Sequence, residues 1–184
     1  MNQRERLDFA SNFHDKKVWT SNDTEILEII MQDGNDQIWS SCALAMLKHP
    51  DRNWAVTFLI QRLQRCESGR PPLNYMQALG LAGDPRAVPV IRPYYDKYLK
   101  AMEGETTTGI PEDVFFGPVP YHAFLSIAGD LFNITHSQEY DKAISKYFDH
   151  THEQVRWWAE HALGIEGPIS LKRKAEYAAK HKAR

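Results

Sequence analysis

The feature that most constrains the fold is a short turn between two helical segments at residues 78–91. The sequence there is Ala-Leu-Gly-Leu-Ala-Gly-Asp-Pro-Arg-Ala-Val-Pro-Val-Ile. Gly80 and Gly83 have no Cβ, so one permits two helices to approach closely and the other can take the left-handed conformation that ends a helix. Asp84 is the expected N-cap of the next helix, and Pro85 suits its first position because the missing N–H needs no partner there. The stretch therefore predicts an antiparallel pair of helices.

The same pattern recurs along the chain. Ala43-Leu44-Ala45, Ala78-Leu79-Gly80 and Ala162-Leu163-Gly164 fall into register, and Ala123 marks a weaker unit in which Gly129-Asp130 lies inside a helix. A repeat of roughly 40 residues is typical of stacked helical pairs. In the residues 78–91 and 155–164 the chain resembles HEAT-like repeat proteins of the PBS-lyase type.

That resemblance implies a fold and two residue roles. The implied fold is all-α, a right-handed α-solenoid of about four to five antiparallel HEAT-like helix pairs. Asp84 and Arg86 match the family's turn, and the resemblance implies that they form a structural ladder between neighbouring repeats. The concave side of such a stack would carry one set of helices.

We expect one domain over residues 1–184. Residues 1–35 would form N-terminal capping helices, residues 36–167 the repeats, and residues 168–184 a C-terminal capping helix. Within the repeats, Glu103–Pro120 lacks helical periodicity and is rich in Gly, Pro and Thr, which predicts a long loop. Apolar spacing predicts the last two full pairs at residues 121–133 with 137–149, and from residue 153 onward.

Composition narrows the setting. A formal charge of -2 gives no strong attraction to nucleic acid or anionic membranes as a whole. No apolar run approaches the roughly 20 residues that span a bilayer, and the first residues lack the apolar core of a secretory signal. Cys42 and Cys66 lie in apolar helical patterns, which fits a reducing compartment. We expect a cytoplasmic protein.

Aromatic residues supply the candidate binding site. Neighbouring aromatic residues on one helix cannot both enter the core. One of Trp157 and Trp158, and one of Tyr94 and Tyr95, should therefore face a groove or solvent. Phe115 and Phe116 lie in the long loop, where they either pack back over the concave face or meet a partner. The candidate binding residues are Phe115, Phe116, Tyr121, Trp157, Trp158 and Tyr95.

Other chemistry is weakly represented. The cluster around His150 and His152 has residue types that suit zinc, but its spacing does not place two ligands on one helical face, so no metal site is expected. The sequence has no glycine-rich phosphate loop and no nucleophile elbow, and no cofactor is expected. An enzyme is the less favoured interpretation.

Two functions remain open at this stage. The favoured one is a scaffold or adaptor that binds another protein on the concave face of the solenoid. The alternative is a nucleic-acid-binding or base-modifying protein, similar to the HEAT-like DNA glycosylases, which would use the basic C-terminal segment that contains Lys172, Arg173, Lys174, Lys180, Lys182 and Arg184.

Overall fold

The computed structural model describes residues 5, 8, 19–31, 42–66, 72–104, 119–172 and 175. Every regular element in these ranges is a helix, which confirms the predicted all-α class. None of the helices in these ranges combines the length and the apolar character that crossing a membrane requires.

Most described helices follow the predicted positions, but one begins at Val119, so Val119 and Pro120 belong to a helix rather than to the loop predicted at residues 103–120. Short helical stretches also occupy residues 42–46 and 168–172. The named elements are α2 (Ser21–Met31), α4 (Arg52–Gln64), α5 (Leu73–Ala82), the 3-10 turn η2 (Pro85–Ala87), α6 (Val88–Met102), α7 (Val119–Thr135), α8 (Gln138–Ser145) and α9 (Glu153–Ala162). The α8 helix is shorter than expected, because residues 146–149 form turns.

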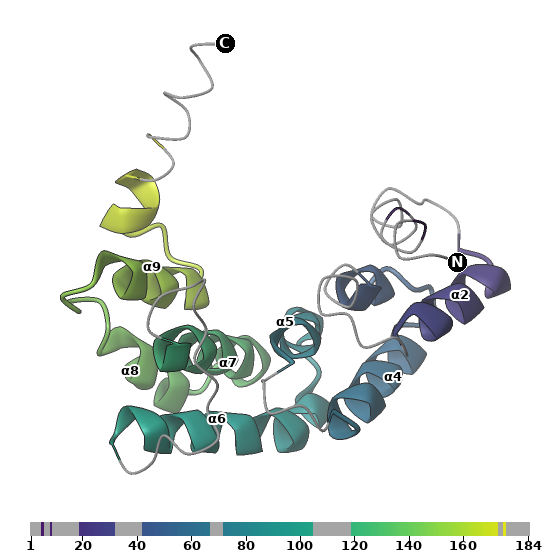
Figure 1. Cartoon of the computed structure of the whole chain (residues 1–184), viewed down its shortest axis with the longest axis horizontal. Coiled ribbons are helices and arrows are strands. Elements are labelled where there is room, and N and C mark those ends of the chain that lie inside the picture. Colours follow the sequence, from purple (N-terminus) through teal and green to yellow (C-terminus); the bar gives the residue numbers. More distant parts are fainter. Residues whose placement is uncertain are drawn as a thin grey trace.

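The helices lie in two rows along a curved path (Figure 1). Helix α7 packs against α5 on one flank and α9 on the other, and these three helices line the inside of the curve. Helices α4, α6 and α8 lie on the outside and pack beneath them. One continuous core of buried apolar side chains joins the two rows.

The turn between α5 and α6 has the predicted chemistry. Gly83 ends α5 in the left-handed conformation, with φ at 67°, and Asp84 caps the next turn by accepting a hydrogen bond from the backbone N–H of Arg86. Pro85 occupies the first position of η2. These three predictions from residues 78–91 are confirmed.

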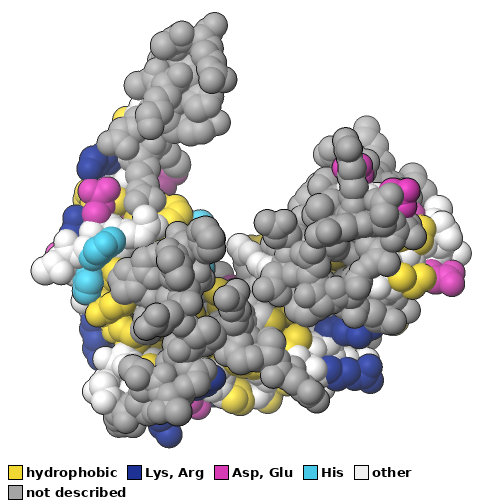
Figure 2. Space-filling view, viewed as in Figure 1, with side chains coloured by type: hydrophobic (Ala, Val, Ile, Leu, Met, Phe, Trp, Pro, Cys, Tyr) yellow, Lys and Arg dark blue, Asp and Glu magenta, His cyan; other side chains and the backbone are white. Residues whose placement is uncertain are grey.

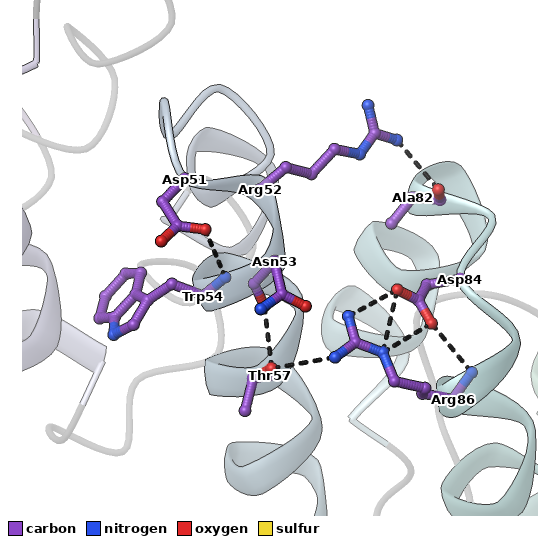
Figure 3. A network of polar contacts seen from close by, with 8 residues as sticks. All are labelled: Asp51, Arg52, Asn53, Trp54, Thr57, Ala82, Asp84 and Arg86. Carbon is purple, nitrogen blue, oxygen red and sulfur yellow. Dashed lines mark hydrogen bonds and ion pairs between the residues drawn. The ribbon is translucent and has the colours of Figure 1, made fainter.

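Arg86 connects this turn to α4, the outer helix of the preceding pair (Figure 3). Its guanidinium donates two hydrogen bonds of 3.0 and 2.7 Å to Asp84 and one of 3.3 Å to the hydroxyl of Thr57 on α4. The hydrogen bond from Arg86 lowers the pKa of the Asp84 carboxyl below its usual range. A second link runs from Arg52 Nη2 to the carbonyl oxygen of Ala82, at 2.9 Å. The two contacts hold α4 against the ends of α5.

Two glycines set the spacing of the inner row. A Cβ on Gly80 would lie 2.7 Å from Asp130 Oδ1, and a Cβ on Gly129 would lie 2.7 Å from the carbonyl oxygen of Ala162. Only a residue without a side chain allows α5, α7 and α9 to come this close. The predicted close approach at Gly80 is therefore present, and Gly129 supplies a second one.

Side chains cap several helix N-termini. Thr20 and Asp23 form a reciprocal cap at α2, where Thr20 N donates to Asp23 Oδ2 at 2.7 Å. The cap of α9 is His152, whose Nδ1 accepts a hydrogen bond from the backbone N–H of Gln154. Glu160 caps residues 168–172 by accepting from two backbone N–H groups, those of residues 169 and 170, and so fixes this short helix on α9.

Candidate functional site

Each helix of the inner row has one side whose residues are partly or fully exposed. On α7, His122, Ser126 and Asn133 are accessible, and their separations of four and seven residues place them on one side of the helix. The residues named below for α5 and α9 are likewise separated by three or four residues. We call this surface the inner face, and it consists of Leu73, Gln77 and Leu81 on α5, His122, Ser126 and Asn133 on α7, and Gln154, Trp157 and His161 on α9.

Large side chains on the inner face remain accessible to a partner. Leu81 is 57% exposed. Contact between an apolar side chain and water is unfavourable, so covering Leu81 would be favourable. The visible Lys and Arg side chains lie mostly along the outer edge of the molecule, at its lower right, bottom and left side (Figure 2), and the residues named for the inner face include no Asp, Glu, Lys or Arg. The inner face is thus a polar and apolar surface with few charges.

The adjacent tryptophans of α9 separate as their sequence predicts. Trp158 is only 6% exposed and its ring lies 4.8 Å from that of His122, where it fills the gap between α9 and α7. Trp157 is partly exposed and stacks on the exposed ring of His161 at 5.6 Å, with the planes 19° apart. Trp157 is therefore the tryptophan of this pair that a binding partner can reach.

Tyr95 belongs to the core rather than to a surface. Its ring is 2% exposed and stacks on Phe124 at 5.4 Å, while Tyr140 packs edge-on at 5.1 Å. Burial raises the pKa of Tyr95 to about 12. Its neighbour Tyr94 is the partly exposed member of that pair. We leave Tyr95 and the buried Trp158 out of the contact surface proposed below.

Tyr121 does not lie on the inner face. Tyr121 is partly exposed, but its ring packs 4.8 Å from His150 and 5.6 Å from Tyr147, at the turn that follows α8. Phe115 and Phe116 lie outside the described residues. Of the six aromatic candidates, Trp157 alone is placed on the inner face by the part of the chain that the structure describes.

The inner row also contains a buried carboxyl group, that of Asp130, which the sequence analysis did not identify as a candidate. It lies on α7, four residues after Ser126 and three before Asn133, and it is 7% exposed. Burial raises the pKa of its carboxyl well above the usual range. The sequence did contain one indication of Asp130, because it is the one acidic residue in a helix that otherwise has no charged residue apart from a histidine.

Replacing Asp130 by Asn should change how stability depends on pH. Because the folded-state pKa is raised, the contribution of the protonated carboxyl is complete below the ordinary value of 3.8 and is lost as the pH rises through the raised value. The Asn variant cannot ionise, so its stability relative to the wild type should increase with pH by roughly 1 kcal/mol per unit over that interval. Urea unfolding at several pH values between about 5 and 8 measures this difference. A difference that stays constant over this range would show that Asp130 is ionised in the folded chain.

The side chains of His150 and His152 accept hydrogen bonds from backbone N–H groups. His150 Nδ1 accepts a hydrogen bond of 3.1 Å from the N–H of His152, and His152 in turn caps α9. The described residues contain no group of three or more His, Cys, Asp or Glu side chains that could hold a metal ion. The imidazoles of this turn therefore have a structural explanation.

Comparison with protein-family models, with curated proteins and with solved structures finds no match to this chain. The conclusions on function therefore depend on the residues of the inner face themselves.

Proposed function

We propose that the chain is a HEAT-like α-solenoid that binds another protein on its inner face. The observation that carries this proposal is the partial exposure of Trp157 beside a buried Trp158. Tryptophan is among the residues that most often contribute the binding energy of protein interfaces. A partner that covered the ring would remove its apolar surface from water, which favours binding. The segment predicted as a loop at residues 103–120, of which Val119 and Pro120 belong to α7, would border the same contact surface.

Two further observations support a stack of repeats. Successive helix pairs pack side by side, because α5, α7 and α9 come from three consecutive pairs and contact one another in order. Arg86 joins the turn of one pair to Thr57 on a helix of the pair before it, and Asp84 holds the Arg86 guanidinium within the turn, which supports a ladder role for Arg86. A row of this kind presents a continuous surface to an extended partner.

The nucleic-acid alternative receives no comparable support from the described residues. Lys172 is the one member of the basic C-terminal segment whose contacts the structure describes, and its ammonium pairs with Glu153 at 2.9 Å. No catalytic activity is proposed.

Trp157→Ala should weaken binding while the helical fold remains. Interface tryptophans of this kind contribute about 2 kcal/mol or more, so the affinity for the partner should fall about thirtyfold. The test is affinity capture of the partner from cell extract with and without nuclease, followed by titration of the captured protein against both variants. Circular dichroism establishes that the variant is folded.

Trp54→Ala is the matched control. Trp54 is also partly exposed, but it lies on α4 in the outer row, where it stacks on Phe58 at 5.3 Å. This variant should retain the partner. Equal loss of the partner in both variants would contradict a role for the inner face, and a partner released by nuclease would favour the nucleic-acid alternative.

A further inference from the structure

The start of α9 is held by two histidines in tandem. His150 Nδ1 accepts a hydrogen bond of 3.1 Å from the backbone N–H of His152, and His152 Nδ1 accepts one of 3.3 Å from the N–H of Gln154. The side chains that usually cap helices are those of Ser, Thr, Asn and Asp, and none of these changes its charge near neutral pH. An imidazole does so between about pH 5 and 8. The connection between α8 and α9 is therefore built from groups that acid can alter.

Both hydrogen bonds require a neutral imidazole. A ring nitrogen accepts from a backbone N–H only when it has no proton, which assigns the proton of each neutral ring to Nε2. In a protonated imidazole both nitrogens carry hydrogen and neither can accept. Each lost bond would leave two N–H groups facing one another. The positive charge would also lie at the N-terminus of α9, where the helix dipole disfavours cations.

The charged neighbours of this turn oppose one another. Arg156 Nη1 donates to the carbonyl oxygens of His150 and of the next residue, at 2.5 and 3.0 Å, and so brings a guanidinium to the turn. Of the nearby carboxylates, Asp149 is exposed to water, and Glu153 pairs with Lys172 at 2.9 Å. The guanidinium disfavours a charged imidazole and the carboxylates favour one. The loss of the two hydrogen bonds therefore decides the direction of the effect.

The other elements at this turn contribute mainly aromatic rings. Tyr121 of α7 and Tyr147 after α8 pack on His150, with ring centroids 4.8 and 6.2 Å away. Burial, followed by the charges of Tyr121 and of Glu103 at the end of α6, raises the pKa of Tyr147. A tyrosine ring attracts a cation, which lowers the cost of protonation at His150. His152 is exposed at the helix end, and protonation therefore costs most there.

The equivalent turn before α4 is built differently. His49 Nδ1 lies 3.0 Å from the backbone nitrogen of Asp51, but also 3.1 Å from its carbonyl oxygen, so a protonated ring has an acceptor within reach. The indoles of Trp19 and Trp54 flank this imidazole at 5.0 and 4.8 Å, and the cap of α4 is the Asp51 carboxylate. The loss of a histidine acceptor on protonation is therefore a property of the turn before α9.

We propose that the turn at residues 149–153 is an acid-sensitive joint, in which protonation of His152, and secondarily of His150, releases the N-terminus of α9. The folded chain then binds fewer protons than the unfolded chain. This contribution to stability is therefore complete above the range in which histidine titrates and is lost as the pH falls through it. Because α9 carries Trp157, the same protonation should weaken binding on the inner face, and this part of the inference rests on the proposed function.

The double variant His150→Asn/His152→Asn tests the joint. An asparagine side chain accepts from the backbone N–H two residues on, as both imidazoles do, but it does not titrate. Between about pH 7.5 and 5.5, the midpoint of thermal unfolding should fall by about 3–6 °C more in the wild type than in the variant, as expected for loss of a cap and a cation left at the helix N-terminus. Groups common to both proteins, Asp130 included, cancel in this difference.

His136→Asn is the matched control. His136 is an exposed histidine directly after α7, and its φ of 52° is a conformation that asparagine accepts. This variant should keep the full acid response of the wild type. An equal acid response of the double variant and the wild type would overturn the proposal.

Nuclear magnetic resonance of the 15N-labelled wild-type chain observes the protonation itself. At about pH 7.5, Nδ1 of both His150 and His152 should have the chemical shift of an unprotonated ring nitrogen. On acidification, the backbone amide signals of residues 153–156 should move together with the imidazole signals of His152. A proton on Nδ1 of His152 at the higher pH would overturn the proposal.

Titration of the captured partner separates this inference from the proposed function. The affinity of the wild type should fall several-fold more on acidification than that of the double variant. Equal losses in the two proteins would overturn the regulation of the inner face. A wild-type chain that captures no partner would instead refute the proposed function, while the difference in thermal unfolding still decides whether the joint exists.

Discussion

Tyr95→Ala is expected to lower the free energy of unfolding by about 3–5 kcal/mol, the range found when a buried aromatic side chain is truncated. The ring is the meeting point of three helices, since Phe124 of α7 and Tyr140 of α8 both pack on it and the Arg92 guanidinium lies 5.2 Å above its centre. For a chain of this size, the midpoint of thermal unfolding should fall by about 10 °C or more. Thermal and urea unfolding followed by circular dichroism give both values.

Tyr95→Phe is the control for this change. It keeps the ring that Phe124 and Tyr140 contact and removes the hydroxyl alone, so the loss should stay within about 1 kcal/mol. If Tyr95→Ala instead remained as stable as the wild type and lost its binding partner, Tyr95 would belong to the contact surface that the sequence predicted for it.

Gly129→Ala should also destabilise the chain, by about 1–3 kcal/mol, against the usual trend for a glycine inside a helix. Alanine normally favours a helix over glycine by up to about 1 kcal/mol. Here the new Cβ would lie 2.7 Å from the carbonyl oxygen and 3.0 Å from the Cα of Ala162, so α7 and α9 would have to separate. Overpacking of this kind outweighs the gain in helix propensity. Urea unfolding measures the net effect.

Ser126→Ala provides the comparison on the same helix. It lies on the uncovered side of α7, adds no atom and raises helix propensity, so the variant should be at least as stable as the wild type. An equal or higher stability of Gly129→Ala would show that α7 and α9 have room to adjust without loss, and that the inner row is less closely packed than the distances indicate.

The candidate site could be predicted from the sequence in part. The rule that adjacent aromatic residues on a helix divide between core and surface holds at both pairs, since Trp158 is buried beside an accessible Trp157, and Tyr95 is buried beside Tyr94. The sequence could not tell which member faces inward, because that depends on where the neighbouring helices lie. Tyr121 illustrates the same limit, since its contacts with Tyr147 and His150 direct it away from the inner face.

The pair Gly129-Asp130 shows that the same two residue types can form different local structures. By its residues Gly129-Asp130 resembles the Gly83-Asp84 turn, although the sequence already places it inside a helix. In the structure both residues lie inside α7, where the glycine makes room for α9 and the aspartate lies against Gly80 of α5. The difference comes from contacts with residues far away in the sequence.

The sequence by itself determined the helical class, the positions of most helices and the turn at Gly83, Asp84 and Pro85. These features depend on local interactions, namely apolar spacing, capping and the conformational freedom of glycine, which act within a few residues. Only the tertiary structure decided which side chains remain accessible on the inner face and that Asp130 is buried without a partner among the described residues. Burial depends on packing between distant helices, and no local pattern encodes it.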